Sequence, residues 1–145
     1  MRRATRRAPG ARRNHEKVCT MATVDLTMDN FENTIEDNGI VLIDFWADWC
    51  GPCKTFAPVF EKASDAHPDI AFAKCDTEQE RDLATQFGIR SIPTLAIFRE
   101  KILLFSQSGA LPESVLEEII AKVRELDMDE VRQQIAEQTA KDTTA

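Results

Sequence analysis

The sequence predicts a single α/β domain of three layers, α/β/α, in which helices cover both faces of a central mixed sheet. Short apolar runs of strand length alternate with segments whose apolar residues recur with the spacing of one helix face. Two strands that lie close together late in the sequence predict an antiparallel hairpin at one edge. With 145 residues, of which 43% are hydrophobic, the chain is long enough for one core.

Residues 23–46 predict two strands with a helix between them. Thr23–Leu26 has the length of a short strand, and Asp29 is the expected N-cap of a helix that ends at Asn38-Gly39. Ile40–Trp46 is an apolar run broken only by Asp44, as expected of a central strand covered on both faces. The one carboxylate inside this run is therefore a candidate for a buried acid.

A helix, a strand and a further helix are predicted over residues 54–88. The apolar spacing of residues 54–66 is helical, and Pro68 ends that helix. Ile70–Cys75 is a second buried strand, and Thr77 opens a helix that ends near Gly88. Because helices join the early strands, we expect these strands to pair in parallel.

The last third of the domain predicts a hairpin and a long helix. Thr94–Phe98 and Ile102–Phe105 are the two strands of the hairpin. Pro112 opens a helix whose apolar stripe runs to Val123. The predicted order of elements is βαβαβαββα.

Both ends differ in composition from the domain, which we place at residues 21–126. Positions 1–20 hold seven basic residues and one acidic residue, so that the chain totals of 18 and 25 leave 11 basic and 24 acidic residues elsewhere. Residues 127–145 are polar, with Met128, Val131 and Ile135 at a thin helical spacing. We expect a partly helical extension there that rests on the domain.

Several interpretations of the basic segment 1–20 are possible. It lacks the apolar core of roughly 7–15 residues found in secretory signals, and it has too few apolar residues for a convincing transit peptide. Its arginines would also attract nucleic-acid phosphates. We favour a disordered extension, or a true start at Met21. Since no apolar run approaches the roughly 18–20 residues of a membrane helix, we expect a soluble cytoplasmic protein with no membrane or nucleic-acid partner.

Of the four cysteines, only Cys50 and Cys53 form a motif. The apolar content is high enough to hold a core without disulfides, so we favour intracellular redox chemistry over structural bridging. A C-x-x-C pair can be half of a zinc site, but neither Cys19, Cys75 nor the histidines supply a second pair at a familiar spacing. We expect no bound metal, a buried Cys75 and an exposed Cys19.

The helix that follows the two cysteines favours thiol chemistry. Its N-terminus offers unpaired N–H groups and a positive dipole end, which would stabilise a thiolate on Cys50. Pro52 suits the first turn, where a missing N–H costs nothing. Cys50 would attack a target disulfide, and Cys53 would then attack Cys50 and release the reduced target.

Three further residues, which we expect near the cysteine pair, are candidate site residues. A buried Asp44 would have a raised pKa and could accept the proton of Cys53, whereas on an exposed strand face it would be an ordinary solvated acid. Lys74, in the neighbouring strand, is either its charge partner or a solvated lysine. Pro93 either adopts a cis peptide bond or marks the start of a strand.

The string Trp49-Cys50-Gly51-Pro52-Cys53-Lys54 resembles the active-site segment of bacterial-type thioredoxins. The resemblance continues in family order through Val41–Asp44, Lys74–Asp76, Gly88–Thr94 and Gly109-Ala110, and it covers roughly residues 22–126. It implies the thioredoxin fold and a thiol–disulfide oxidoreductase that reduces protein disulfides. Electron transport and cell redox homeostasis are the processes that such an activity serves.

The resemblance also implies roles for single residues. Cys50 matches the nucleophile and Cys53 the resolving cysteine. Asp44 matches the buried acid, Lys74 the lysine beside it, and Pro93 the cis-proline that lies against the active-site disulfide and aligns the target chain.

The implied docking surface for protein substrates consists of Trp49, Ile92 and Gly109. Gly51 and Pro52, between the cysteines, resemble the reducing members of the family. No bound cofactor is implied beyond the reversible Cys50–Cys53 disulfide, and the electrons would come from NADPH through a flavoprotein thioredoxin reductase. We expect a monomer.

Departures from the family pattern leave the choice of partner open. Arg99-Glu100-Lys101 replaces the usual Asn-Gly turn, which predicts a looser or longer hairpin. Ser108 replaces an apolar residue and predicts a softer docking surface. The alternatives to a general reductase are a reductase dedicated to one partner, such as a peroxidase or a methionine-sulfoxide reductase, and a thioredoxin-fold scaffold without redox function.

Overall fold

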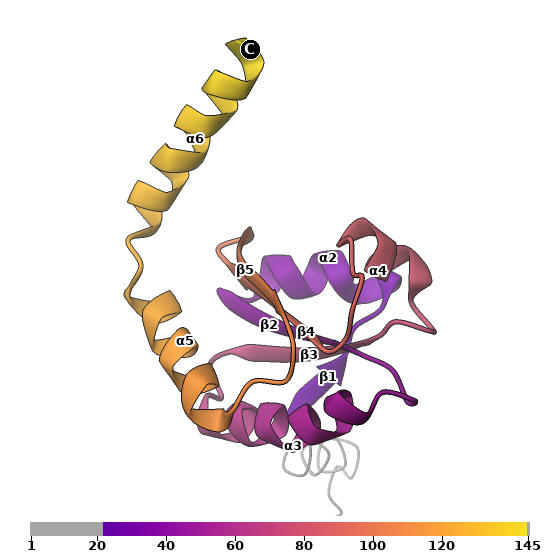
Figure 1. Ribbon diagram of the computed structural model, residues 1–145. Coiled ribbons are helices and arrows are strands. Elements are labelled where there is room, and N and C mark those ends of the chain that lie inside the picture. The colour runs from indigo at the N-terminus through magenta and orange to yellow at the C-terminus, as the bar shows by residue number, and fades with distance from the viewer. Residues whose placement is uncertain (1–21, 145) are drawn as a thin grey trace, which may run out of the picture.

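The computed structural model describes residues 22–144, so the predictions for residues 1–20, an exposed Cys19 among them, lie outside the described residues. Figure 1 shows a central sheet with helices on both faces and one helix that projects away from it. The elements in chain order are β1 (Thr23–Asp25), α2 (Met28–Asp37), β2 (Ile40–Trp46), α3 (Gly51–Ala66), β3 (Ala71–Asp76), α4 (Arg81–Gln86), β4 (Thr94–Arg99), β5 (Ile102–Ser108), α5 (Glu113–Glu125) and α6 (Met128–Thr144).

The strands form one mixed sheet in the order β1-β3-β2-β4-β5. β3 pairs in parallel with β1 and β2, while β4 is antiparallel to β2 and β5 is antiparallel to β4. The predicted mixed sheet, with its hairpin at one edge, is confirmed. In this register Asp44 of β2 lies between Lys74 of β3 and Leu95 of β4.

Each face of the sheet has its own apolar core. α3 and α5 cover one face, where Phe56, Phe60 and Leu116 are buried, and α2 and α4 cover the other, where Phe45 and Leu83 are buried (Figure 1). Burial of one such side chain contributes roughly 1.5–3 kcal/mol. The two cores together therefore fix the three-layer arrangement around β2.

The N-cap of α2 is Thr27, so the prediction of Asp29 was wrong. The Thr27 hydroxyl accepts the Asn30 N–H at 3.2 Å, and the Asn30 side-chain oxygen accepts the Thr27 N–H at 2.8 Å. This reciprocal capping box satisfies two backbone donors at once. Asp29 lies inside the first turn instead, where a negative charge still suits the helix dipole.

Helix α4 begins at Arg81 and not at Thr77, which corrects a second predicted boundary. Asp76 accepts backbone N–H groups of Glu78 at 2.9 Å and Gln79 at 3.4 Å, and the Thr77 hydroxyl donates to the Trp46 carbonyl at 3.1 Å. These side chains stabilise a turn after β3, because their bonds to the backbone compete with helix formation.

The hairpin between β4 and β5 is tight, so the prediction of a looser or longer turn was wrong. Arg99 and Ile102 are paired, which leaves only Glu100 and Lys101 in the turn, with φ of 51° and 70°. Two positive φ values suit the twist of the adjoining strands, although side chains other than Gly and Asn rarely adopt them. The Glu100 N–H holds the turn by donating to the Gly39 carbonyl at 2.8 Å.

Helix α6 projects from the domain and does not rest on it, contrary to the prediction for residues 127–145 (Figure 1). Its contact with the domain is at the base, where Met128 is buried and Arg132 pairs with Glu100 at 2.7 Å. Farther along, Ile135 is 44% exposed. The apolar stripe is too thin to bury the whole length of the helix.

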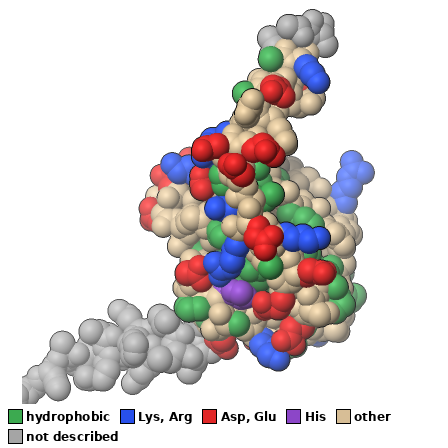
Figure 2. Space-filling view, turned by 90° about the vertical axis from the view of Figure 1, so that its left-hand side faces the viewer, with side chains coloured by type: hydrophobic (Ala, Val, Ile, Leu, Met, Phe, Trp, Pro, Cys, Tyr) green, Lys and Arg blue, Asp and Glu red, His purple; other side chains and the backbone are tan. Residues whose placement is uncertain are grey.

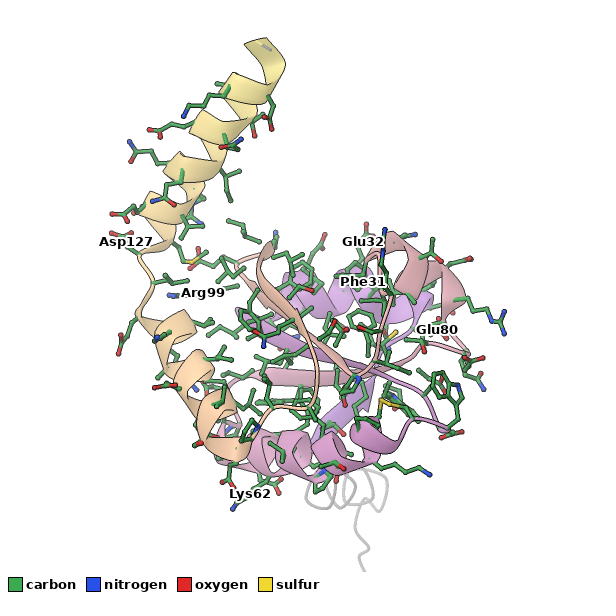
Figure 3. All side chains as sticks on the ribbon, in the orientation of Figure 1. Phe31, Glu32, Lys62, Glu80, Arg99 and Asp127 are labelled. Atoms are coloured by element: carbon green, nitrogen blue, oxygen red, sulfur yellow. A yellow bond between two sulfur atoms is a disulfide. The ribbon has the colours of Figure 1, made fainter. Side chains whose placement is uncertain are left out.

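Arg99 fixes the junction from which α6 departs (Figure 3). Its guanidinium donates to the carbonyls of Val123 at 2.7 Å, Arg124 at 3.3 Å and Leu126 at 2.9 Å. The last carbonyls of a helix lack the N–H groups of a following turn, although the Val123 carbonyl also accepts the Leu126 N–H at 3.4 Å. A cation at this end is also favoured by the helix dipole.

Acidic and basic side chains are interspersed on the face shown in Figure 2, over α5 and the start of α6. The pairs on this side include Arg124 with Asp69 at 2.7 Å, His67 with Glu117 at 2.7 Å and Lys62 with Glu113 at 3.0 Å. Within residues 22–144, no helix is both long enough and apolar enough to cross a membrane.

Lys101→Gly should stabilise the protein, because glycine adopts a φ of 70° without the steric cost that lysine bears. We expect a gain of about 0.5–1 kcal/mol in the free energy of unfolding, measured by urea denaturation. Lys101→Ala is the matched control, since it removes the side chain but keeps Cβ. An equal gain in both variants would contradict backbone strain as the cause.

Candidate active site

Cys50 and Cys53 lie at the N-terminus of α3 and form a disulfide with a Cα–Cα distance of 5.2 Å. Helix α3 begins at Gly51, a few residues earlier than predicted, because the Cys50 side chain is its N-cap. The Cys53 backbone N–H donates to Cys50 Sγ at 3.1 Å. Pro52 occupies the start of the helix, where no N–H is required.

The environment of Cys50 Sγ favours negative charge. The first turn of α3 contains no acidic residue, so the positive end of the helix dipole is not offset there. A sulfur that accepts a backbone N–H in the oxidised form can accept the same bond as a thiolate. The arrangement therefore prepares Cys50 for nucleophilic chemistry.

The loop before β4 lies against this sulfur. Cys50 Sγ is 3.7 Å from the Ile92 carbonyl oxygen, and the Ile92–Pro93 peptide bond is cis. The Gly109 N–H donates to the Pro93 carbonyl at 2.8 Å. Segments far apart in the sequence, at positions 50, 92–93 and 109, thus meet at one edge of the sheet.

Ser108 forms a polar link within this edge. Its hydroxyl is 2.9 Å from the Ser91 hydroxyl and 3.2 Å from that of Thr94. Where the sequence predicted a softer docking surface, Ser108 ties β5 to the loop that carries Pro93.

Asp44 is buried on β2 behind Cys53. Its side chain is 0% exposed, and neither carboxylate oxygen has a hydrogen-bond partner among residues 22–144. Burial raises its pKa from 3.8 to about 7, an effect that Lys74 opposes and Glu61 reinforces. A carboxyl group with this pKa can take up or release a proton near neutral pH.

Asp44 and Cys53 share a cleft of about 130 Å³ with Lys74, Lys54 and Asp48. The Lys74 side chain is 15% exposed, and its ammonium lies 5.4 Å from the centre of the Trp46 ring. The cleft gives a path by which a proton or a water molecule can reach both the carboxyl and the inner sulfur.

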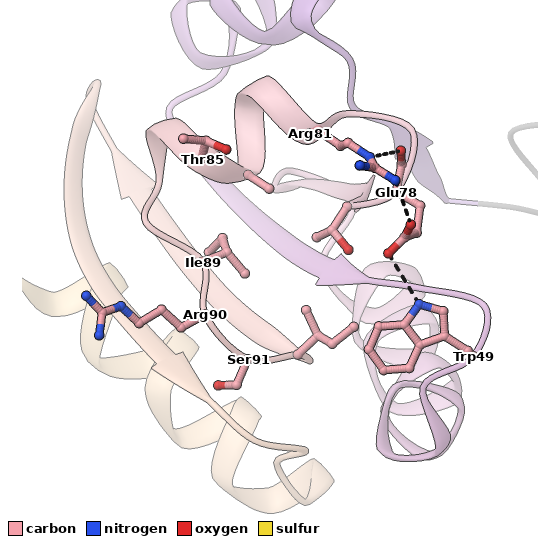
Figure 4. A pocket seen from close by; sticks show the side chains of 10 residues that line it. Trp49, Glu78, Arg81, Thr85, Ile89, Arg90 and Ser91 are labelled. Atoms are coloured by element: carbon pink, nitrogen blue, oxygen red, sulfur yellow. Dashed lines mark hydrogen bonds and ion pairs between the residues drawn. The ribbon is translucent and has the colours of Figure 1, made fainter.

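A groove of about 630 Å³ runs beside Trp49, which is 69% exposed (Figure 4). The Trp49 indole N–H donates to Glu78 at 3.3 Å, and Glu78 in turn pairs with Arg81 at 3.4 Å. Apolar side chains, Ile89 and Ile92 among them, line the groove together with polar ones that include Glu78 and Arg81.

Comparisons with known proteins agree with this geometry. The sequence profile of thioredoxin matches residues 22–122. A protein of Streptomyces coelicolor, provisionally named thioredoxin 2, is 59% identical over 119 residues, which cover 82% of this chain and 89% of that protein. The thioredoxin of Alicyclobacillus acidocaldarius is 42% identical over 103 residues, with 70% and 98% covered. A solved mutant thioredoxin from Halobacterium salinarum has a TM-score of 0.67 at 33% identity, with 72% and 92% covered.

The chain belongs to the thioredoxin family. It is of the bacterial type and has the thioredoxin fold. As a thioredoxin it is a thiol–disulfide oxidoreductase of the protein-disulfide reductase class, and Cys50 and Cys53 are its disulfide-forming pair. Its substrates are proteins that contain disulfides.

The fold of this thioredoxin brings together the residues that the sequence singled out. Cys50, Cys53, Ile92, Pro93 and Gly109 meet at one edge of the sheet. Asp44 and Lys74 lie beneath Cys53, while Trp49, Gly51 and Pro52 are on the outer side. Cys75 is buried, and burial raises the pKa of its thiol to about 12, so it is inert as a nucleophile.

The sequence did not identify Glu61, Glu78 and Arg81 as parts of the site. Glu61 contacts Lys74, Glu78 contacts Trp49, and Arg81 pairs with Glu78. Each is one of many charged residues on a helix or turn surface, and its spacing from the C-x-x-C pair follows no known motif. Their place in the site depends on how α3, β3 and the turn before α4 pack together, which the sequence alone does not show.

Asp44→Asn should stabilise the oxidised protein at alkaline pH. Because the folded-state pKa of about 7 exceeds the ordinary 3.8, the folded state binds the proton more tightly, and stability falls as pH rises through that interval. We expect the variant to gain up to about 4 kcal/mol in unfolding free energy near pH 8.5 and little near pH 4.

Urea unfolding at the two pH values measures this difference, and Asp48→Asn, an exposed change in the same cleft, is the control. A gain for Asp44→Asn that is the same at both pH values would contradict a raised pKa as its cause.

Proposed function

We propose that this thioredoxin reduces disulfides in protein substrates with Cys50 as the attacking thiolate and Cys53 as the resolving thiol. The observation that supports this assignment best is the position of Cys50 Sγ as the N-cap of α3, where the Cys53 N–H donates to it at 3.1 Å. Cys53 lies one turn into the helix and has no comparable donor among the bonds of the described residues.

The exchange proceeds in two steps. The Cys50 thiolate attacks one sulfur of the substrate disulfide, so that a Cys50–substrate bond forms and the other substrate sulfur leaves as a thiolate. Cys53 then loses its proton and attacks Cys50 Sγ. The Cys50–Cys53 disulfide forms, the substrate's second sulfur leaves, and two electrons have passed to the substrate.

We assign the proton acceptor for Cys53 to Asp44. The two residues line one cleft, and in the part of the chain that the structure describes the carboxyl group has no hydrogen-bond partner that would compete for the proton. With a pKa of about 7 it is poised to exchange a proton near neutral pH. Lys74, close to the same cleft, stabilises the carboxylate once it forms.

The substrate docks, in this proposal, across Trp49, Ile92 and Gly109. The Ile92 carbonyl oxygen lies 3.7 Å from Cys50 Sγ, and Trp49 and Ile92 also line the 630 Å³ groove, which continues the same surface. Gly51 and Pro52 are exposed at the start of α3, directly after Cys50, which is itself 3% exposed.

The electrons for the next cycle come from NADPH through a thioredoxin reductase, which re-reduces the Cys50–Cys53 disulfide. The protein acts in the cytoplasm and contributes to cell redox homeostasis. The basis for these assignments is family membership together with a redox disulfide at the N-terminus of α3.

NADPH-coupled insulin reduction with a thioredoxin reductase tests the proposal. Wild type should turn over, and Cys50→Ser should lose turnover by at least about 10³-fold because no thiolate remains to attack. Cys75→Ala, which removes the buried third thiol, is the control and should retain it.

Turnover that persists in Cys50→Ser would contradict the assignment of the nucleophile. No turnover in the wild type, with both thiols free, would contradict a general reductase and would favour a dedicated partner or a scaffold.

A further inference from the structure

The Lys74 ammonium is held by a group other than Asp44. Lys74 and Asp44 are paired in register on adjacent strands, yet no ion pair within 4.0 Å joins them in the described part of the chain. Lys74 Nζ instead lies 3.6 Å from Oε2 of Glu61. The face of Trp46, 5.4 Å away, further restrains the ammonium.

Glu61 belongs to the same face of α3 as the inner cysteine. Cys53, Ala57 and Glu61 are four residues apart in turn, so their side chains follow one line along the helix. Cys53 and Ala57 line the cleft that contains Asp44, and Glu61 reaches Lys74 from the far end of that line. The Glu61 side chain is 49% exposed, which keeps its own charge hydrated.

The competition for one ammonium has a chemical consequence. A lysine in direct contact with a buried carboxyl group would hold it as a carboxylate, and a carboxylate already paired with a cation is a poor proton acceptor. A lysine drawn toward the surface still attracts the carboxylate, but it leaves the carboxylate oxygens free to bind a proton.

We propose that Glu61 is a positioning residue of the redox site: its carboxylate holds the Lys74 ammonium away from Asp44, so that the buried carboxyl group can exchange a proton with Cys53. This inference rests on the proposed function only in its last step, since the contact between Glu61 and Lys74 is independent of any substrate.

Lys74 and Glu61 also act on Asp44 directly through their charges, apart from the contact between them. Burial is the largest cause of its raised pKa, Lys74 lowers the pKa, and Glu61 raises it. The titratable and charged groups that face Asp44 from the surrounding elements are Lys74 and Cys75 on β3, Cys53, Lys54 and Glu61 on α3, and Asp48 before it. Of these, Lys74 and Glu61 are the two charges that contribute to its pKa, with opposite signs.

Glu61→Gln tests the inference through the titration of the Asp44 carboxyl carbon, followed by NMR in the oxidised protein. The variant removes the charge that holds Lys74 and keeps the side-chain length. We expect the Asp44 pKa to fall by about one pH unit as the ammonium moves toward it. Asp65→Asn, an exposed change on the same helix, is the matched control and should leave the titration unchanged.

A second pair of variants asks whether Glu61 acts through Lys74. In a Lys74→Met background the Asp44 pKa should be higher than in wild type. Glu61→Gln should then lower the Asp44 pKa by less than it does in wild type, because only the direct charge effect of Glu61 remains. The inference would be overturned if Glu61→Gln left the Asp44 pKa unchanged. It would also be overturned if the pKa fell equally with and without Lys74, because Glu61 would then act on Asp44 directly.

The pH dependence of the resolving step separates this inference from the proposed function. In single-turnover release of a substrate from Cys50, the pH midpoint should shift downward in Glu61→Gln together with the Asp44 pKa. A shift in the Asp44 titration without a shift in release would support the positioning role and contradict Asp44 as the proton acceptor. Absence of both shifts would contradict the positioning role itself.

Discussion

The hydrogen bond from the Cys53 N–H to Cys50 Sγ is the interaction on which the rest of the site depends. It exists because α3 begins at Gly51, directly after Cys50, and because Phe56 and Phe60 bury the same helix against the sheet. An N-terminal amide needs an acceptor, and here a sulfur atom supplies it. The same contact thus caps the helix and activates the nucleophile.

The antiparallel part of the sheet decides what faces that sulfur. Phe45 of β2 pairs with Thr94 of β4, and Thr94 pairs with Ser108 of β5, so the end of β2, the start of β4 and the end of β5 lie in one row. The residues just beyond that row, Cys50, Ile92-Pro93 and Gly109, are those that meet beside the disulfide. Asp44 occupies the next position inward. Burial there raises the pKa of its carboxyl group to about 7, and it also lowers the stability of the fold at alkaline pH.

Much of the fold could be predicted from the sequence because its signals are local. The apolar runs of β2 and β3 and the cysteine pair needed no knowledge of contacts between distant segments. The errors lie where side chains bind the backbone: Thr27 and Asp76 set helix starts, and the contact of Glu100 with Gly39 keeps the hairpin tight. Likewise the roles of Glu61 and Glu78 depend on the register between elements, which no spacing along the chain records.

If the start of α3 makes Cys50 the reactive thiolate, differential alkylation will distinguish the two cysteines. In the reduced protein near pH 7, iodoacetamide followed by peptide mass spectrometry should modify Cys50 at least about tenfold faster than Cys53, because the thiolate is the reacting species. Equal modification, or faster modification of Cys53, would contradict the claim. Unfolding in urea should abolish the difference, since both thiols then lose the helix that distinguishes them.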